Sequence, residues 1–232
     1  MAQQAAGAEL AHSGALAAFG VAASYVASGI FAALMPSELQ GRPEISAHTF
    51  WTVLSERPAA HLAFHGAWVA AGLCGLLAVP ALSAAVWRAK PGAVLWSGAA
   101  AWLGFAVQAR SHLMELAFDR KIIPVYRSAS PAFQEAVHVA ASLALDVPDG
   151  VLTYGAIGVW LIVVARLAGG AAFAWLGVAA GVSLLAGMLG YALLWRPLLV
   201  FSIGVGGSLL VPAWFVWAGL RLRRGEVFAL AR

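Results

Sequence analysis

Six long hydrophobic stretches alternate with polar segments along this chain of 232 residues. Each stretch is close to the roughly 20 residues that an α-helix needs to cross a hydrocarbon core about 30 Å thick. Because lipid offers the backbone no hydrogen bonds, we expect these stretches to form helices that cross a membrane. We place the six spans at residues 14–35, 61–87, 92–118, 151–168, 171–195 and 197–220.

Two long polar segments separate some of these spans, at residues 36–60 and 119–150. The second segment holds an amphipathic stretch that starts at Ser130 and Pro131, which suit the N-cap and the first position of a helix. A helix continuing from there through the fourth span would be about 57 Å long, far beyond the thickness of a bilayer. Pro148 favours a break, so we predict a separate external amphipathic helix over residues 131–145.

The composition agrees with a membrane protein. Hydrophobic residues make up 62% of the chain and charged residues 10%, whereas soluble domains have about 45–50% and about 25%. This balance excludes an ordinary soluble enzyme, and such high hydrophobicity excludes a disordered chain. The predicted fold class is all-α: a polytopic membrane helical bundle with six transmembrane helices and an external amphipathic helix, forming a single integral membrane domain over residues 1–232.

The basic residues follow the ends of apolar stretches, where cations bind anionic headgroups, so the net charge of +4 does not indicate a nucleic-acid partner. An even number of spans puts both termini on one side of the bilayer. The basic residues expected on that side are Arg88, Lys90, Arg166, Arg221, Arg223 and Arg224. The positive-inside rule therefore predicts a cytoplasmic-membrane protein with both termini in the cytoplasm and both long loops outside.

Polar side chains gather at the predicted outer ends of the spans, and five of the six histidines are among them. Helical spacing sorts these side chains into three stripes, each on one face of a helix. The stripes are His61 and His65; Gln108, His112, Glu115 and Asp119; and Glu135, His138, Ser142, Asp146 and Asp149. Ionisable groups at membrane depth usually face a bundle interior or an aqueous cavity, so these stripes form a candidate site.

Imidazole and carboxylate groups together suit a transition metal such as zinc, iron or copper. The candidate metal ligands are His61, His65, His112, Glu115, Glu135 and His138. A haem b held by His65 and His112 is the other candidate cofactor. Gln108, Asp146 and Asp149 are candidates for a polar or proton-carrying pocket. The leading hypothesis is an outward-facing pocket with a redox or metal-handling role.

Other interpretations use the same residues. Charges near span ends can simply lie among the headgroups, and the pocket can hold a lipid or small molecule without a cofactor. Alternatively, the glycine-rich fifth and sixth spans, with Gly177 and Gly181 in a GxxxG pattern, can pack against a membrane partner or a second copy. The chain has no H-E-x-x-H, C-x-x-C or G-x-S-x-G motif, so whether it catalyses a reaction stays open.

The layout resembles a group of bacterial six-helix integral membrane proteins of about this size. The shared features are a long first external loop, the short connection Arg88–Lys90, a polar end to the third span and a final span closing with WAGLRLRR. The resemblance implies a membrane protein, and it assigns no activity and no functional residue.

Overall fold

In the computed structural model, residues 2–40, 45–145 and 149–225 are described, with side chains for 7–40, 45–140 and 150–225, and these residues form helices and no strands. The helices are α1 (Ala2–Leu34), η1 (Ser37–Leu39), α2 (Ala47–Glu56), α3 (Ala59–Val86), α4 (Pro91–Ile122), η2 (Tyr126–Ser128), α5 (Pro131–Leu145), α6 (Asp149–Leu167), α7 (Ala171–Ala192), α8 (Arg196–Phe201), η3 (Ser202–Leu210) and α9 (Val211–Arg224).

Six helices are long and apolar enough to cross a membrane, which confirms the all-helical prediction and the number of candidate spans in the described residues. They cover Gly7–Leu34, Ala59–Val86, Pro91–Ile122, Gly150–Leu167, Ala171–Ala192 and Arg196–Arg224. The first helix starts well before the predicted residue 14. The segment ahead of that residue is rich in alanine, the strongest helix former, and therefore extends the helix.

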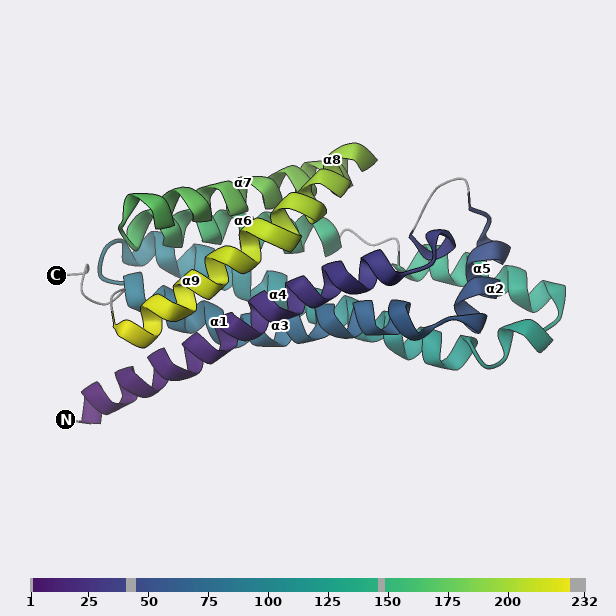
Figure 1. Cartoon of the computed structure of the whole chain (residues 1–232), viewed down its shortest axis with the longest axis horizontal. Coiled ribbons are helices and arrows are strands. Elements are labelled where there is room, and N and C mark those ends of the chain that lie inside the picture. Colours follow the sequence, from purple (N-terminus) through teal and green to yellow (C-terminus); the bar gives the residue numbers. More distant parts are fainter. Residues whose placement is uncertain (1, 41–44, 146–148, 226–232) are drawn as a thin grey trace.

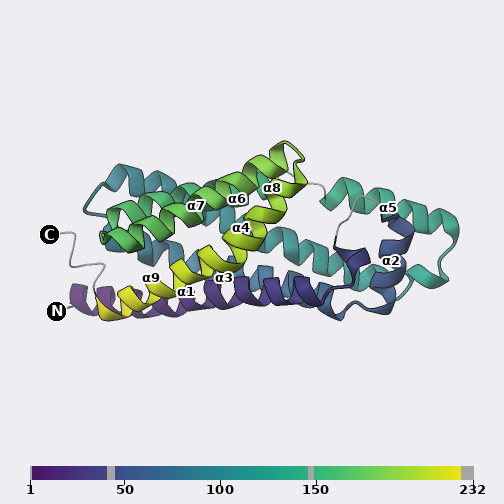
Figure 2. The same ribbon diagram turned by 45° about the horizontal axis from the view of Figure 1, so that its top comes forward.

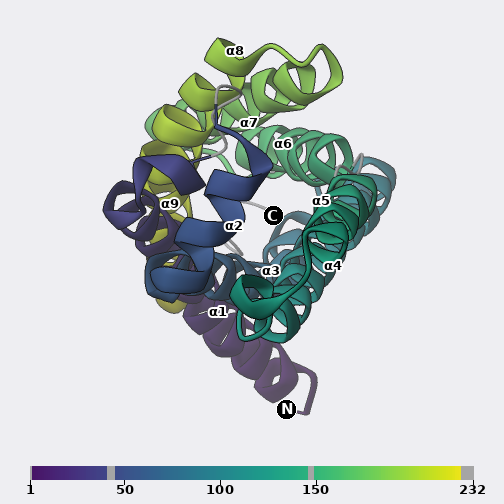
Figure 3. The same cartoon turned by 90° about the vertical axis from the view of Figure 1, so that its right-hand side faces the viewer.

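The candidate spans are arranged so that each one contacts the next around the bundle. α1 packs on α3, α3 on α4, α4 on α6 and α6 on α7, and η3 and α9 close the order by contacting α7 and α1. The start of α1, the end of α9 and the α3–α4 connection lie at one end of the molecule (Figure 1). α2 and α5 lie at the opposite end, which faces the viewer in Figure 3.

Glycines bring α6 and α7 into close contact. A Cβ atom at Gly181 would lie 2.5 Å from the backbone oxygen of Gly158, and one at Gly177 would lie 2.3 Å from the Cβ of Ala165. Both distances are too short for a side chain, so the GxxxG pattern of α7 is used inside this chain. Contact of the glycine-rich spans with a partner or a second copy stays a prediction.

The sixth candidate span contains a π-helical segment, η3, just before Pro212. Proline has no N–H to donate, so the carbonyl of Ser208, four residues earlier, loses its usual helical partner. The neighbouring Val211 N–H instead bonds to Gly206 O, five residues back, which is the π-helical pattern. The proline thus explains where the span departs from regular α-helical geometry.

A second, smaller hydrophobic cluster lies where α2 and α5 meet the ends of the long helices, at the right-hand end of the molecule in Figure 2. Its buried members are Met35, Leu39, Trp51, Leu54, Tyr126 and Val137. α5 covers the predicted residues 131–145, and Ser130 accepts a hydrogen bond from the backbone N–H of Phe133, as an N-cap does. Phe64 packs against both this cluster and the main hydrophobic core, so it lies at the boundary between the two.

Candidate metal centre

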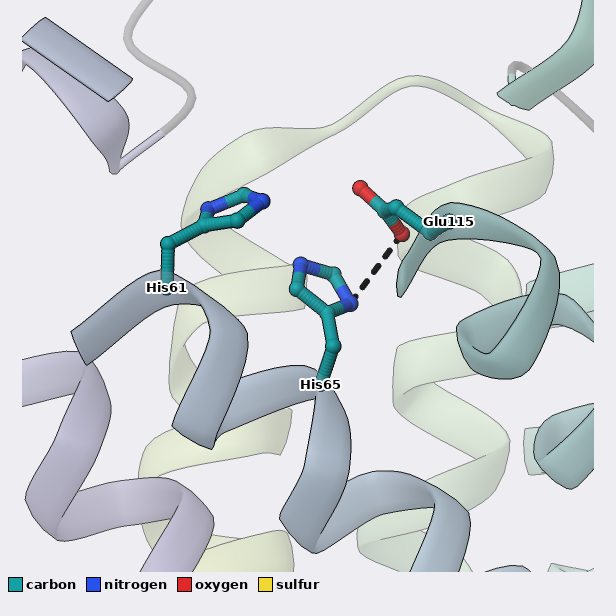
Figure 4. Close-up of side chains that lie close together, drawn as sticks. All are labelled: His61, His65 and Glu115. Atoms are coloured by element: carbon teal, nitrogen blue, oxygen red, sulfur yellow. Dashed lines mark ion pairs between the residues drawn. The ribbon is translucent and has the colours of Figure 1, made fainter. Parts of the chain in front are cut away.

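The first two predicted stripes meet between α3 and α4. These neighbouring helices run in opposite directions, so the start of α3 lies beside the end of α4. His61 and His65, one turn apart on α3, therefore face the polar stripe of α4. Figure 4 shows His61, His65 and Glu115 pointing toward a common space.

His65 is at the centre of the cluster. Its Nδ1 lies 2.8 Å from His112 Nδ1 and 3.1 Å from Glu115 Oε2. The remaining distance, from His112 Nδ1 to Glu115 Oε2, is 3.9 Å. Metal bonds to imidazole nitrogen and carboxylate oxygen are about 2.0–2.2 Å long, so ligand atoms around a tetrahedral ion lie about 3.3 Å apart. The three measured distances bracket this value.

His61 adds a further nitrogen donor to the cluster. His61, His65 and Glu115 each offer one ligand atom, and these atoms lie within 4.8 Å of one another. Asp119 approaches His61 from α4, with 3.1 Å between His61 Nε2 and Asp119 Oδ2, and both side chains are almost fully buried. A carboxylate beside a histidine is the usual partner that orients the ring and raises its basicity in metal sites.

Aromatic rings surround the cluster and restrict its side-chain rotamers. The Trp68 ring stacks on His112 at 5.6 Å between centroids, and Phe64 lies edge-on to His65 at 5.0 Å. Phe50, from α2, lies edge-on to His61 at 5.8 Å. The imidazoles are thus held in position before any ligand arrives, which lowers the entropy lost on binding.

Two buried polar atoms in this region have no hydrogen-bond partner in the described structure: Nδ1 of His61 and Nε1 of Trp68. An unsatisfied buried polar atom costs about 1–3 kcal/mol. Such atoms are rare in folded proteins, and those that occur often mark a functional site or the place of a bound ion or water. Both belong to residues that contact the histidine cluster, which strengthens it as a ligand site.

Gln108 lies one helical turn deeper than His112, and its side chain forms hydrogen bonds to two neighbouring helices. Its amide nitrogen donates to the backbone oxygen of Trp68 at 3.1 Å, and its side-chain oxygen accepts from the Tyr25 hydroxyl at 3.5 Å. These bonds link α1, α3 and α4 beneath the cluster. Sequence reasoning missed Tyr25 and Trp68, although Trp68 follows His61 and His65 at the spacing of one helix face.

The members of the third predicted stripe whose side chains are described, Glu135 and His138, are not brought into the cluster. Glu135 and His138 are exposed on α5. Glu135 instead influences Tyr126, a member of the second hydrophobic cluster. The pKa of Tyr126 is raised, first by burial and second by the charge of this carboxylate. Asp149 begins α6, and the predictions for Asp146 and for the Asp149 side chain fall outside the described part of the chain.

The arrangement does not fit a haem between His65 and His112. Two axial imidazoles lie on opposite faces of the porphyrin, with ring centroids about 6 Å apart, because each metal–nitrogen bond is about 2 Å long. The His65 and His112 rings have centroids only 5.0 Å apart, and their Nδ1 atoms face each other at 2.8 Å, which leaves no room for a porphyrin between them. The same two nitrogens are well placed as neighbouring ligands of one small ion.

Comparisons with known proteins found no protein-family model, curated protein or solved structure that matches the chain. The six candidate spans and the cluster between α3 and α4 are therefore the basis of the proposal that follows.

Proposed function

We propose that this is a multi-pass membrane protein that binds a transition-metal ion between α3 and α4. His61, His65 and Glu115 are the proposed ligands, and His112 is the fourth. The observation that carries the proposal is the mutual approach of three ligand atoms, all within 4.8 Å, in a largely buried site. Asp119 is the proposed positioning residue, acting through His61.

The donor set favours zinc or iron(II). Imidazole with carboxylate suits both ions, whereas copper(I) prefers thiolate or thioether ligands. The single cysteine, Cys74, lies deeper on α3, where its sulfur faces Gly20. Two histidines and one carboxylate are the protein ligands of many catalytic zinc sites and of iron(II) oxygenases.

A metal-handling role agrees better with the ligands than a zinc-protease mechanism. In those enzymes the two histidines of H-E-x-x-H enclose a glutamate that acts as the base. The corresponding segment here is His61-Leu-Ala-Phe-His65, which has the histidine spacing but no glutamate. With His112 as a fourth ligand, the site would be closed, as in sites that hold an ion rather than activate water.

We also propose that the protein lies in a cytoplasmic membrane with the metal centre toward the outside. The support is the basic pair Arg88 and Lys90 in the short α3–α4 connection, together with Arg223 and Arg224 in the last turn of α9 at the same end of the molecule. The positive-inside rule puts that end in the cytoplasm and the α2–α5 end outside.

A matched pair of glutamate variants tests the metal site. We expect Glu115→Gln to weaken binding of Co²⁺, a spectroscopic substitute for zinc, by at least about tenfold, because the amide lacks the negative charge of the ligand. Glu135→Gln, on the exposed face of α5, is expected to bind like the wild type. Titration of purified protein followed by visible absorption measures both affinities. Equal affinity in all three proteins would overturn the proposal.

Metal binding is expected to weaken as the pH falls. Histidine ligates a metal only when its ring nitrogen is unprotonated, and carboxylate only when it is ionised. Protons therefore compete with the ion as the pH falls, and affinity should drop by up to about tenfold per pH unit for each ligand that must lose a proton. The same Co²⁺ titration between pH 8 and pH 5 measures this slope. A higher affinity at pH 5 than at pH 8 would contradict ligation by histidine and glutamate.

A further inference from the structure

A hollow lies near the end of the α3–α4 pair that is opposite the metal centre, and it has a volume of about 550 Å³. About 27 Å of helix axis separate Ser83, in its wall, from His65 of the metal centre, at 1.5 Å per residue. The hollow is lined from the α3 side by Pro80, Ser83, Trp87 and Arg88, and from α4 by Gly98 and Trp102, among others. It shares no residue with the metal centre.

The hollow exists because both helices carry small residues at this level. Ala84 on α3 and Ala99 on α4 line it, and a Cβ atom at Gly98 would already lie 3.0 Å from Ser83 Oγ. Two large side chains complete the lining: Trp87 is 42% exposed and Trp102 is 48% exposed. The chain thus leaves a broad part of both indole rings uncovered beside a groove made by small side chains.

An acyl chain is the occupant that this lining suits. The hollow lies on candidate membrane spans, and nearly all of its lining side chains are apolar. Inside a bilayer, such a groove meets hydrocarbon chains rather than water. Indole rings at a membrane interface pack against lipid with their apolar faces, which agrees with the exposed Trp87 and Trp102.

Arg88 is the one strongly polar side chain among the lining residues described, and it sits just beyond the end of α3. Its guanidinium can donate two parallel hydrogen bonds to a phosphate, a geometry that lysine lacks. Lys90 adds charge at the same end of the molecule. We propose that the hollow binds one anionic phospholipid, with an acyl chain in the α3–α4 groove and the headgroup phosphate on Arg88.

Native mass spectrometry of the detergent-solubilised full chain tests the proposal. Phosphatidylglycerol and phosphatidylcholine with identical acyl chains are the probes. Both lipids carry a phosphate, but the choline cation cancels its charge in phosphatidylcholine, so the wild type should retain one phosphatidylglycerol in preference to phosphatidylcholine. Arg88→Gln should reduce that preference about fivefold, the contribution of one arginine near an anionic surface. Ala99→Leu, which fills the groove, should reduce retention of both lipids.

Arg166→Gln is the matched control, because Arg166 is an exposed arginine at the same end of the molecule outside the hollow. It should leave lipid retention unchanged. An equal loss of preference in Arg88→Gln and Arg166→Gln would overturn the proposal, since it would indicate attraction to the whole basic surface. Undiminished retention in Ala99→Leu would overturn the acyl-chain site. Co²⁺ binding should persist in every variant, so the two proposals fail separately.

Discussion

Replacing His65 with alanine is expected to abolish high-affinity metal binding while leaving the helical fold intact. His65 Nδ1 is the atom that approaches both His112, at 2.8 Å, and Glu115, at 3.1 Å. Loss of a residue that only hydrogen-bonds to a metal ligand typically lowers metal affinity about 10–100-fold. Loss of the ligand itself should therefore lower the affinity by more than about 100-fold. Elemental analysis of purified protein and Co²⁺ titration measure the change.

His138→Ala is the control for that experiment. His138 is also a histidine at the α2–α5 end, and its sequence pattern makes it a candidate ligand, but the structure leaves it exposed on α5. We expect metal content and Co²⁺ affinity in this variant to equal those of the wild type. If His65→Ala retains its metal, or if both variants lose it equally, the proposed centre is wrong. Circular dichroism checks that each variant remains helical.

Replacing Gly181 with leucine should destabilise the protein by about 3 kcal/mol or more. The added Cβ would lie 2.5 Å from the backbone oxygen of Gly158 and 2.6 Å from Ile162 Cγ1. Backbone cannot rotate out of the way as a side chain can, so α6 and α7 must separate. Separation removes close packing, and lipid supplies no hydrophobic drive to restore it. Thermal unfolding in mild detergent, followed by gel filtration, measures the loss.

Gly204→Leu is the matched substitution for this test. Gly204 lies in the next candidate span, is exposed, and would give its Cβ no neighbour within 4 Å. We expect its unfolding temperature to remain close to that of the wild type. A Gly181→Leu protein as stable as Gly204→Leu would show that the close approach of α6 and α7 is not required for the fold.

Much of the fold can be predicted from local features of the sequence. The lengths of the apolar stretches predict six candidate spans, and Ser130 with Pro131 predicts the start of α5. These signals act within one helix, through hydrogen bonding and proline geometry. The start of α1 was harder to predict, because alanine forms helix readily whether or not the segment lies in a membrane.

The candidate site could be predicted only in part, because spacing gives the face of a helix and not the direction that the face points. The stripes containing His61 and Glu115 do meet, since α3 and α4 are consecutive and antiparallel. The stripe containing His138 depends on how α5 docks, which packing against α2 and α4 decides. The stacking of Trp68 on His112 is likewise a property of the assembled bundle.

The length of α4 sets how an ion reaches the centre. With 32 residues, α4 is about 48 Å long, roughly 18 Å more than a hydrocarbon core of about 30 Å. Glu115 is in the last third of the helix. If α4 crosses a bilayer as proposed, the cluster would lie near the level of the headgroups rather than at the midplane. Ions would then exchange with one aqueous compartment only. A centre that loads and releases its ion from one side does not act as a permeation pathway, because the ion never crosses the hydrocarbon core.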